Sequence, residues 1–321
     1  MDTIQFSDRK ASVDFYESRY SHGYMGHWSN FDKNRLLGLI KSLGLPAKGN
    51  ALDFGCGRGI FTEVIREALP GWTFSGCDIS GEAIESAKKN IPGISFFVLG
   101  DKSFNDKKFD FIHSHHVLEH TFDDSVTAGE MSGYAADHCV MLHSLPCNHE
   151  GSLEYRFSKW TKNGFDPLTG KFFFEDTAHI RRLNVTQARA LFSRYQFKLR
   201  KGYYSNQYWG AIKWIAESNF GLVRNISNPF HANSFSSFFK LLVWRRHLVF
   251  AWFCFFAASA FSPADKGKYY AMKKLIQAIS FILFFWMAIP VTRFISSKAI
   301  KEWDEKKESP DGTDMFLVFE R

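Results

Sequence analysis

The chain has 321 residues, 45% of them hydrophobic and 23% charged, which predicts a packed core and excludes an intrinsically disordered chain. The net charge of +7 is unevenly distributed. Residues 210–310 hold 14 Lys or Arg and 6 Asp or Glu, whereas the rest of the chain holds 26 and 27. The basic excess falls on the most apolar segment, which favours a membrane surface over a nucleic acid as partner.

Short apolar runs alternate with amphipathic stretches along the first two thirds of the chain. The N-terminus has no apolar core behind a basic start, so no signal peptide is expected. Helices are predicted at 31–45, 60–69, 80–90, with Ser80 as N-cap, and 184–195. Strands are predicted at 50–55, 72–78, 93–101, 108–116, 137–146, 196–205 and 314–321. Strands that alternate with helices indicate an α/β fold with a doubly wound, mostly parallel sheet.

Composition divides the chain into three parts. Residues 1–45 are expected to form an N-terminal helical cap, and 46–205 with 311–321 the α/β core. Residues 206–310, rich in Phe, Trp and Leu, are expected to form an apolar, basic helical insert between strands six and seven.

A glycine-rich turn follows the first predicted strand in "ALDFGCGRGIFTEVI", residues 51–65. Glycines there leave no Cβ between backbone and ligand, and the helix that follows presents free N–H groups. The third glycine, Gly59, comes one residue early for the dinucleotide pattern GxGxxG. Asp53 would repel a pyrophosphate but could meet a cationic or amine-bearing ligand. The turn therefore favours a ligand other than a dinucleotide.

Two further acids follow successive strands. Asp78 ends the second strand, where a carboxylate can accept hydrogen bonds from ribose hydroxyls, and Asp101 follows the third, within reach of an adenine amino group. Together with the glycine turn, these acids indicate an adenosine site without phosphates.

The ordered set "LDFGCGRG…CDIS…LGD…FDFIHSHHVLEH" resembles the class I S-adenosylmethionine-dependent methyltransferases, most closely the quinone-biosynthesis and small-molecule branch. The resemblance covers roughly residues 12–205 and the last strand. It implies a Rossmann-like seven-stranded sheet whose last strand, "DMFLVFER", is antiparallel. It also implies S-adenosylmethionine as cofactor, with its methionine part near Asp53, Gly55 and Gly57, its ribose on Asp78 and its adenine on Asp101. The other expected cofactor-binding residues are Cys56, Ile79, Gly100 and His115.

A histidine cluster, "HSHHVLEH", ends the fourth strand. His115, His116 and Glu119 are the candidate catalytic residues, because a neutral histidine can take a proton from a hydroxyl near pH 7. Proximity and alignment alone are the alternative, because the sulfonium is already a good leaving group. His113 is expected to be structural. Glu119 and His120 could bind a metal with another histidine, but the sequence does not identify a third ligand, and no metal is predicted.

Polar and aromatic residues elsewhere are candidates for an acceptor pocket or for a cap over the cofactor, with solvated loops as the alternative. They are His149, Glu150, Glu154, Tyr155, Arg156, His179, Arg181 and Arg182 for the acceptor, and Tyr16, Arg19, Tyr20 and Tyr24 for the cap.

The insert contains two uncharged apolar runs, 248–261 and 275–291. The first is shorter than the about 20 residues that span a bilayer, and Pro290 interrupts the second. The link 262–274 is rich in lysine, which disfavours its transfer across a membrane. A hairpin lying in one leaflet over about residues 240–300 is expected, with anchors at Trp244, Arg245, Arg246, Trp252, Trp286 and Arg293. A soluble helical subdomain and a dimer interface are the alternatives.

These features predict an S-adenosylmethionine-dependent methyltransferase on the cytoplasmic face of a membrane. The expected reaction is O-methylation of a membrane-associated small molecule or a lipid-linked glycan precursor. A prenylated quinone or phenol is an alternative acceptor, and methylation of a lipid amine is also open. A membrane-bound adaptor without activity is an alternative of another class. RNA is disfavoured because the catalytic part lacks a basic excess, and the oligomeric state is not predicted.

Overall fold

A computed structural model describes residues 8–24, 28–101, 104, 106–261 and 270–321. The chain divides into two compact units. We call Asp2–Pro146, Ala178–Gly202 and Phe316–Arg321 the sheet unit, and Cys147–Thr177 with Tyr203–Met315 the helical unit. The last two strands contribute residues to both units. The helical unit includes Cys147–Thr177, although the sequence predicts these residues in the α/β core.

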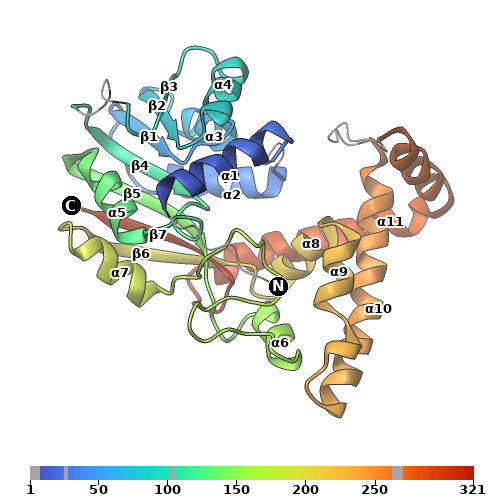
Figure 1. The fold of residues 1–321 in the computed structure, drawn as a ribbon. Coiled ribbons are helices and arrows are strands. Elements are labelled where there is room, and N and C mark those ends of the chain that lie inside the picture. Colours follow the sequence, from blue (N-terminus) through green and yellow to red (C-terminus); the bar gives the residue numbers. More distant parts are fainter. Residues whose placement is uncertain (1–7, 25–27, 102–103, 105, 262–269) are drawn as a thin grey trace. The chain divides into compact units, whose positions relative to one another are not determined.

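The sheet has seven strands in the order β3-β2-β1-β4-β5-β7-β6 (Figure 1). The strands are β1 (Asn50–Phe54), β2 (Thr73–Asp78), β3 (Ser95–Val98), β4 (Phe109–His115), β5 (Ala135–Pro146), β6 (Lys198–Ser205) and β7 (Asp314–Glu320). Strands β1 to β5 pair in parallel, and β7 is antiparallel. The predicted α/β, Rossmann-like sheet with a late antiparallel strand is confirmed, as is the helical insert between β6 and β7.

The helices of the sheet unit are α1 (Arg9–Ser21), α2 (Asn30–Lys41), α3 (Ile60–Ala68), α4 (Gly81–Asn90), α5 (Asp124–Gly133) and α7 (Val185–Ser193). The hydroxyl of Ser80 accepts a hydrogen bond from the Ala83 N–H, so the predicted N-cap of α4 is confirmed. Helix α4 buries Ala83, Ile84 and Ala87 on one face because these residues recur at helical spacing.

The helices of the helical unit are α6 (Leu153–Trp160), α8 (Trp209–Glu217), α9 (Phe220–Ile226), α10 (Phe235–Ala258) and α11 (Tyr270–Lys306), with the 3-10 turns η2 (Pro229–His231) and η3 (Ser259–Phe261). Helices α8, α10 and α11 pack on one another. The Glu302 carboxylate, on α11, accepts hydrogen bonds from the N–H groups of Tyr208, Trp209 and Gly210 and so caps the N-terminus of α8.

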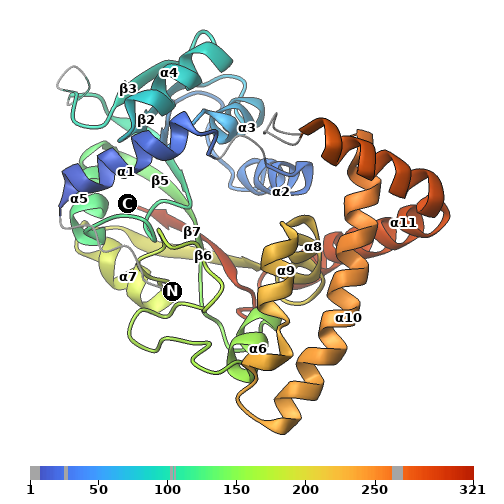
Figure 2. The same cartoon turned by 45° about the vertical axis from the view of Figure 1, so that its right-hand side comes forward.

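Helix α11 has 37 residues and continues through Pro290, the residue that interrupts the second apolar run in the sequence. A proline inside a helix removes one backbone hydrogen bond and usually produces a bend rather than an end. Both views show α11 bent along its length (Figures 1 and 2). Helix α10, with 24 residues, and α11, with 37, are each longer than the uncharged runs 248–261 and 275–291, and the first of these runs continues past α10 into η3.

Candidate active site

A cavity of about 380 Å³ opens at the carboxyl ends of the parallel strands of the sheet unit. Phe54 ends β1, Asp78 ends β2 and His115 ends β4, while Leu99 follows β3, and all four line the cavity. The strand order reverses between β1 and β4, because β2 and β3 lie on one side and β5 on the other. Ligands of open α/β sheets bind at this position.

The glycine turn forms one wall of the cavity. Gly55 has φ +75° and Gly57 has φ +51°, in the left-handed region that glycine adopts at little cost. A Cβ on Gly55 would lie 2.4 Å from Val117 Cγ2, and one on Gly57 would lie 2.8 Å from the Tyr20 hydroxyl. A side chain at Gly55 would therefore clash with Val117, and one at Gly57 would displace the Tyr20 hydroxyl.

Asp78 ties the glycine turn to the next strand. Its carboxylate accepts a hydrogen bond of 2.9 Å from the Gly57 N–H and one of 3.0 Å from the Ser80 N–H. Burial raises the pKa of Asp78 to about 6, although these hydrogen bonds lower it. The carboxylate is thus charged near neutral pH and faces the cavity.

Helix α1 covers the turn with aromatic side chains. Tyr16 and Tyr20 line the cavity, and so does Tyr24, whose ring centre lies 3.7 Å from the Arg19 guanidinium carbon. The Glu17 carboxylate accepts hydrogen bonds from the N–H groups at the start of α4, including one of 2.6 Å from Gly81. This contact attaches α1 to the N-terminus of α4.

His115 is enclosed by rings inside the cavity. Its ring centre lies 3.9 Å from that of Phe61 and 4.8 Å from that of Trp28, and the residue is only 8% exposed. Neither ring nitrogen has a hydrogen-bond partner among the described residues. Burial, and then the neighbouring His116, lower the pKa of His115 well below its usual value. A neutral imidazole with an open nitrogen can accept a proton or a hydrogen bond from a ligand.

Asp53 lies beneath the glycine turn rather than among the cavity residues. It pairs in register with His113 on the neighbouring strand, so the two side chains share a face of the sheet. Its carboxylate contacts His113 Nδ1 at 2.9 Å and accepts a hydrogen bond of 2.6 Å from the Thr62 hydroxyl. Asp53 thus joins β1, β4 and α3, and His113 has the buried place expected of a structural residue.

His116 and Glu119 form a pair at the turn after β4. His116 has φ +54°, unusual for a non-glycine residue, and lines the cavity. Its Nδ1 lies 2.7 Å from Glu119 Oε1, and the Glu119 side chain is buried. Burial alone would raise the pKa of Glu119, but His116, His120 and His179 lower it to about 2. Glu119 is therefore a buried carboxylate surrounded by imidazoles.

The cavity brings together seven of the eleven residues predicted as catalytic or cofactor-binding. Those that line it are Gly55, Cys56, Gly57, Asp78, Ile79, His115 and His116. Asp53, Gly100 and Asp101 are not lining residues of this cavity, and Glu119, the remaining catalytic candidate, reaches it through His116.

The predicted acceptor residues of 149–156 belong to the helical unit and are not among the residues that line the cavity. The Glu154 carboxylate accepts hydrogen bonds of 2.6 Å from Trp214 Nε1 and from the Thr313 hydroxyl. The Tyr155 hydroxyl donates to Glu150. These contacts assign Glu154 and Tyr155 to the packing of the helical unit.

Two aromatic residues of the cavity, Trp28 and Phe61, were not among the sequence candidates. The only sequence signal for Trp28 is the aromatic density of residues 15–28, of which 25–27 lie outside the described residues. In the sequence, Phe61 is indistinguishable from any other apolar residue of an amphipathic helix. Its contact with His115 depends on how α3 packs beside β4.

A family model described as a methyltransferase domain matches residues 28–201, more than half of the chain. The chain belongs to this family. The matched residues form the S-adenosylmethionine-dependent methyltransferase domain that the sequence predicts. The narrower resemblance to the quinone-biosynthesis branch is not shown.

Among curated proteins, the methyltransferase is similar to the ribosomal RNA small subunit methyltransferase C of Yersinia pestis (strain Pestoides F) and of Yersinia pseudotuberculosis serotype O:1b (strain IP 31758). Identity with each is 32% over 99 residues, which is 29% of this chain and 28% of the relative. The match thus spans little more than a quarter of these relatives.

Among solved structures, the YcgJ protein from Bacillus subtilis matches with a TM-score of 0.44 and 20% identity, over 64% of this chain and 88% of that one. The plantazolicin methyltransferase BpumL, solved in complex with a triazolic desmethylPZN analog and SAH, matches with a TM-score of 0.44 and 13% identity, over 99% of this chain and 93% of that one.

Proposed function

We propose that the methyltransferase holds S-adenosylmethionine in the cavity of the sheet unit and methylates a hydroxyl oxygen of a membrane-associated acceptor. The acceptor class that we favour is a membrane-associated small molecule or a lipid-linked glycan precursor, reached from the cytoplasmic face of a membrane. S-adenosylmethionine supplies an activated methyl group on a sulfonium centre. The residues of this chain bind the cofactor, orient it and accept the proton of the acceptor's hydroxyl group.

The cavity suits this cofactor in size and chemistry. A volume of about 380 Å³ falls in the range of small-molecule sites. The bare backbone at Gly55 and Gly57 permits close approach, and the Asp78 carboxylate can accept hydrogen bonds from ribose hydroxyls. The rings of Tyr20 and Phe61 provide faces that favour a cation such as a sulfonium.

His115 is the group that we assign as general base. Its ring nitrogens have no hydrogen-bond partner among the described residues and the residue lines the cavity, so one nitrogen can receive the acceptor's hydroxyl proton as the methyl group is transferred. Replacing His115 and His116 separately by Ala tests this role. We expect His115→Ala to lower turnover at saturating cofactor by about 10²-fold or more. Unchanged turnover in both variants would exclude a histidine base.

One observation supports the membrane association: α11 exposes apolar side chains that a soluble core helix would bury. Helices α10 and α11 are long and apolar enough to cross a membrane by length and composition, a test that buried helices of soluble proteins also pass. Only 11% of the most apolar 18-residue stretch of α11, however, is buried. The exposed side chains are Met272, Leu275, Ile276, Ile279, Ile282, Leu283, Phe284, Phe285 and Trp286.

Basic residues accompany this apolar surface. Arg246 and Arg293 are exposed on α10 and α11, as expected of groups that meet anionic headgroups. Trp286 is exposed, whereas Trp244 packs on Phe157. Trp252, another predicted anchor, donates a hydrogen bond to the Ser218 carbonyl. Of the three tryptophans predicted as anchors, Trp286 fits that role best.

Sedimentation with vesicles tests membrane association. The full-length protein should sediment with vesicles rich in anionic phospholipid, and Leu283→Glu should weaken this binding at least tenfold, because it places a charge where an apolar side chain would be buried. Leu168→Glu is the matched control, since Leu168 is an exposed leucine of the helical unit outside α10 and α11. Equal sedimentation of both variants, or none by the unaltered protein, would argue against a membrane-bound acceptor.

The acceptor itself is best sought by mass spectrometry of lipid and glycan extracts after gene deletion. We expect one lipid-linked species to lose 14 mass units, the mass of one methylene. A loss confined to a prenylated quinone or phenol would redirect the proposal to that class. RNA is disfavoured despite the names of the curated relatives, because the chain outside 210–310 has no basic excess.

A further inference from the structure

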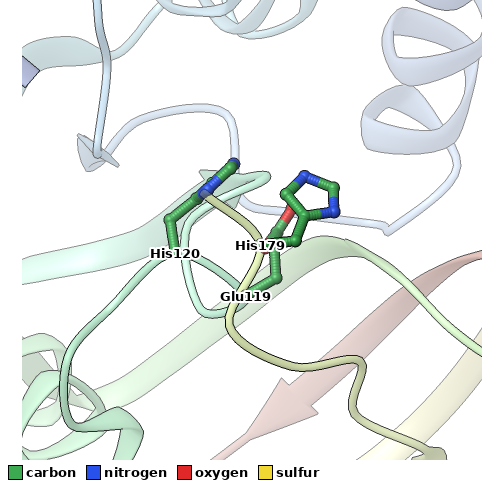
Figure 3. A group of neighbouring side chains, drawn as sticks. All are labelled: Glu119, His120 and His179. Carbon is green, nitrogen blue, oxygen red and sulfur yellow. The ribbon is translucent and has the colours of Figure 1, made fainter. Parts of the chain in front are cut away.

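Three potential metal ligands meet beside the cavity of the sheet unit. Glu119 and His120 lie in the turn after β4, and His179 lies in a segment about sixty residues further along the chain. One donor atom from each lies within 4.8 Å of the other two. Figure 3 shows the three side chains together, with His179 coming from a separate stretch of backbone.

The Glu119 carboxylate has one oxygen available to a ligand. Its Oε1 contacts His116 Nδ1 at 2.7 Å, whereas its Oε2 is buried and has no hydrogen-bond partner among the described residues. The residue is only 1% exposed. A buried carboxylate oxygen without a partner is costly, and a bound cation is a common remedy.

The His120 ring is oriented as a metal ligand would be. Its Nδ1 lies 3.2 Å from the Ala178 carbonyl oxygen, and because a carbonyl can only accept, Nδ1 carries the hydrogen. The neutral ring then has its lone pair on Nε2. Metal-binding histidines usually donate their other N–H to a carbonyl or carboxylate in this way.

Hydrogen bonds hold the segment around His179 in place. The Ile180 N–H donates a hydrogen bond of 2.8 Å to the Glu119 carbonyl, and Arg181 Nη1 donates one of 2.8 Å to the Thr121 carbonyl. Arg181 Nη2 also donates to the Phe122 carbonyl. The segment that carries His179 is therefore tied to the turn that carries the other two ligands.

We propose that Glu119 Oε2, His120 and His179 bind a divalent transition-metal ion at the wall of the cavity. Two imidazoles and one carboxylate suit Zn²⁺ or Mn²⁺ rather than Mg²⁺ or Ca²⁺, which prefer sets of oxygen ligands. Donors about 2.1 Å from one ion lie about 3 to 3.5 Å apart, so binding would draw the three side chains together by small rotations.

The ion would face the cavity, because His120 and its neighbours His116 and Thr121 line it. Three protein ligands leave coordination positions open, and an acceptor hydroxyl placed there would be oriented and more easily deprotonated. This role rests on the proposed function, whereas binding of the ion does not.

Titration of the full-length protein, after treatment with chelator and dialysis, tests the site without any acceptor. Calorimetry with ZnCl₂ and with MnCl₂ should show one ion per chain, and elemental analysis after dialysis should confirm it. We expect His179→Ala and Glu119→Gln to weaken binding at least 100-fold. His138→Ala is the control, because His138 is exposed on β5 and outside the cluster.

S-adenosylmethionine calorimetry on His179→Ala checks that this variant is folded, since His179 is not a lining residue of the cavity. Binding of neither ion by the unaltered protein, or binding that both substitutions leave unchanged, would overturn the metal site. A clear preference for Mg²⁺ would overturn its assignment to a transition metal. Failure of the vesicle and acceptor experiments alone would leave the metal site standing, so the two proposals fail separately.

Discussion

Gly55→Ala would show how tightly the glycine turn is packed. Gly55 directly follows β1 with φ +75°, and its N–H donates a hydrogen bond of 2.7 Å to the Cys77 carbonyl. An added Cβ would lie 2.4 Å from Val117 Cγ2, far inside van der Waals contact. The substitution therefore adds a steric clash to an unfavourable backbone conformation.

The two costs can be separated with a second glycine. A left-handed conformation costs an L-residue about 1–2 kcal/mol, and overpacking costs about 1–3 kcal/mol, so Gly55→Ala should lower the free energy of unfolding by about 2–5 kcal/mol. Gly93 has φ +86°, but its Cβ would have no atom within 4 Å. Gly93→Ala should lower the free energy of unfolding only by the cost of the left-handed backbone, about 1–2 kcal/mol.

Urea denaturation, with hydrogen exchange in β1 to assign the transition to the sheet unit, measures both variants. The double variant Gly55→Ala/Val117→Ala removes the clashing methyl groups, and we expect it to recover about 1–3 kcal/mol in a double-mutant cycle. A Gly55→Ala that costs no more than Gly93→Ala, or a cycle without coupling, would refute the packing argument.

Three further predictions concern charged and titratable groups. Affinity for S-adenosylmethionine, measured by calorimetry, should fall as the pH drops through about 6, because Asp78 becomes protonated and accepts hydrogen bonds less well. Burial lowers the pKa of His143 to about 3, so the unfolded state binds more protons than the folded state between about pH 6.5 and 3. The free energy of unfolding, measured by urea denaturation, should therefore fall on acidification by up to the order of 5 kcal/mol. Glu302→Gln should destabilise the helical unit by about 1–3 kcal/mol in the same assay, because it removes the charge that caps α8.

Each of these predictions has a matched control. Asp78→Asn should bind the cofactor weakly and without the dependence on pH near 6. His143→Gln should reduce the loss of stability in acid, whereas His138→Gln, on an exposed residue, should not. Glu305→Gln, on an exposed carboxylate of α11, should leave stability nearly unchanged. A control that behaves like its partner variant would contradict the corresponding assignment.

Much of the sheet unit could be predicted because its signals are local. The apolar runs predict the strands, and the glycines predict the turn at Gly55. Ser80 predicts the start of a helix, because its side chain can accept a hydrogen bond from the N–H group three residues later. Asp78 could be placed in the cavity because carboxyl ends of parallel strands meet at one edge of a sheet. These inferences need only a few consecutive residues and the rules of parallel sheets.

Other features depend on contacts that the sequence does not encode locally. Asp53 faces His113 because β1 and β4 pair in one particular register, and this pairing turns the carboxylate away from the cavity. His179 meets Glu119 only because Ile180 and its neighbours bind the turn after β4 across about sixty residues. Pro290 interrupts the second apolar run in the sequence, yet α11 continues through it and packs on α8 and α10.

At the end of β4, the backbone geometry places His113, His115 and His116 in three different environments. Side chains alternate along a strand, so His113 and His115 share one face, where the first meets Asp53 and the second reaches the cavity. The left-handed backbone at His116 then breaks the alternation and starts the turn that carries Glu119 and His120. A positive φ is uncommon for a residue other than glycine, although histidine adopts it more readily than most, and the contact between His116 Nδ1 and Glu119 Oε1 closes the turn in this conformation.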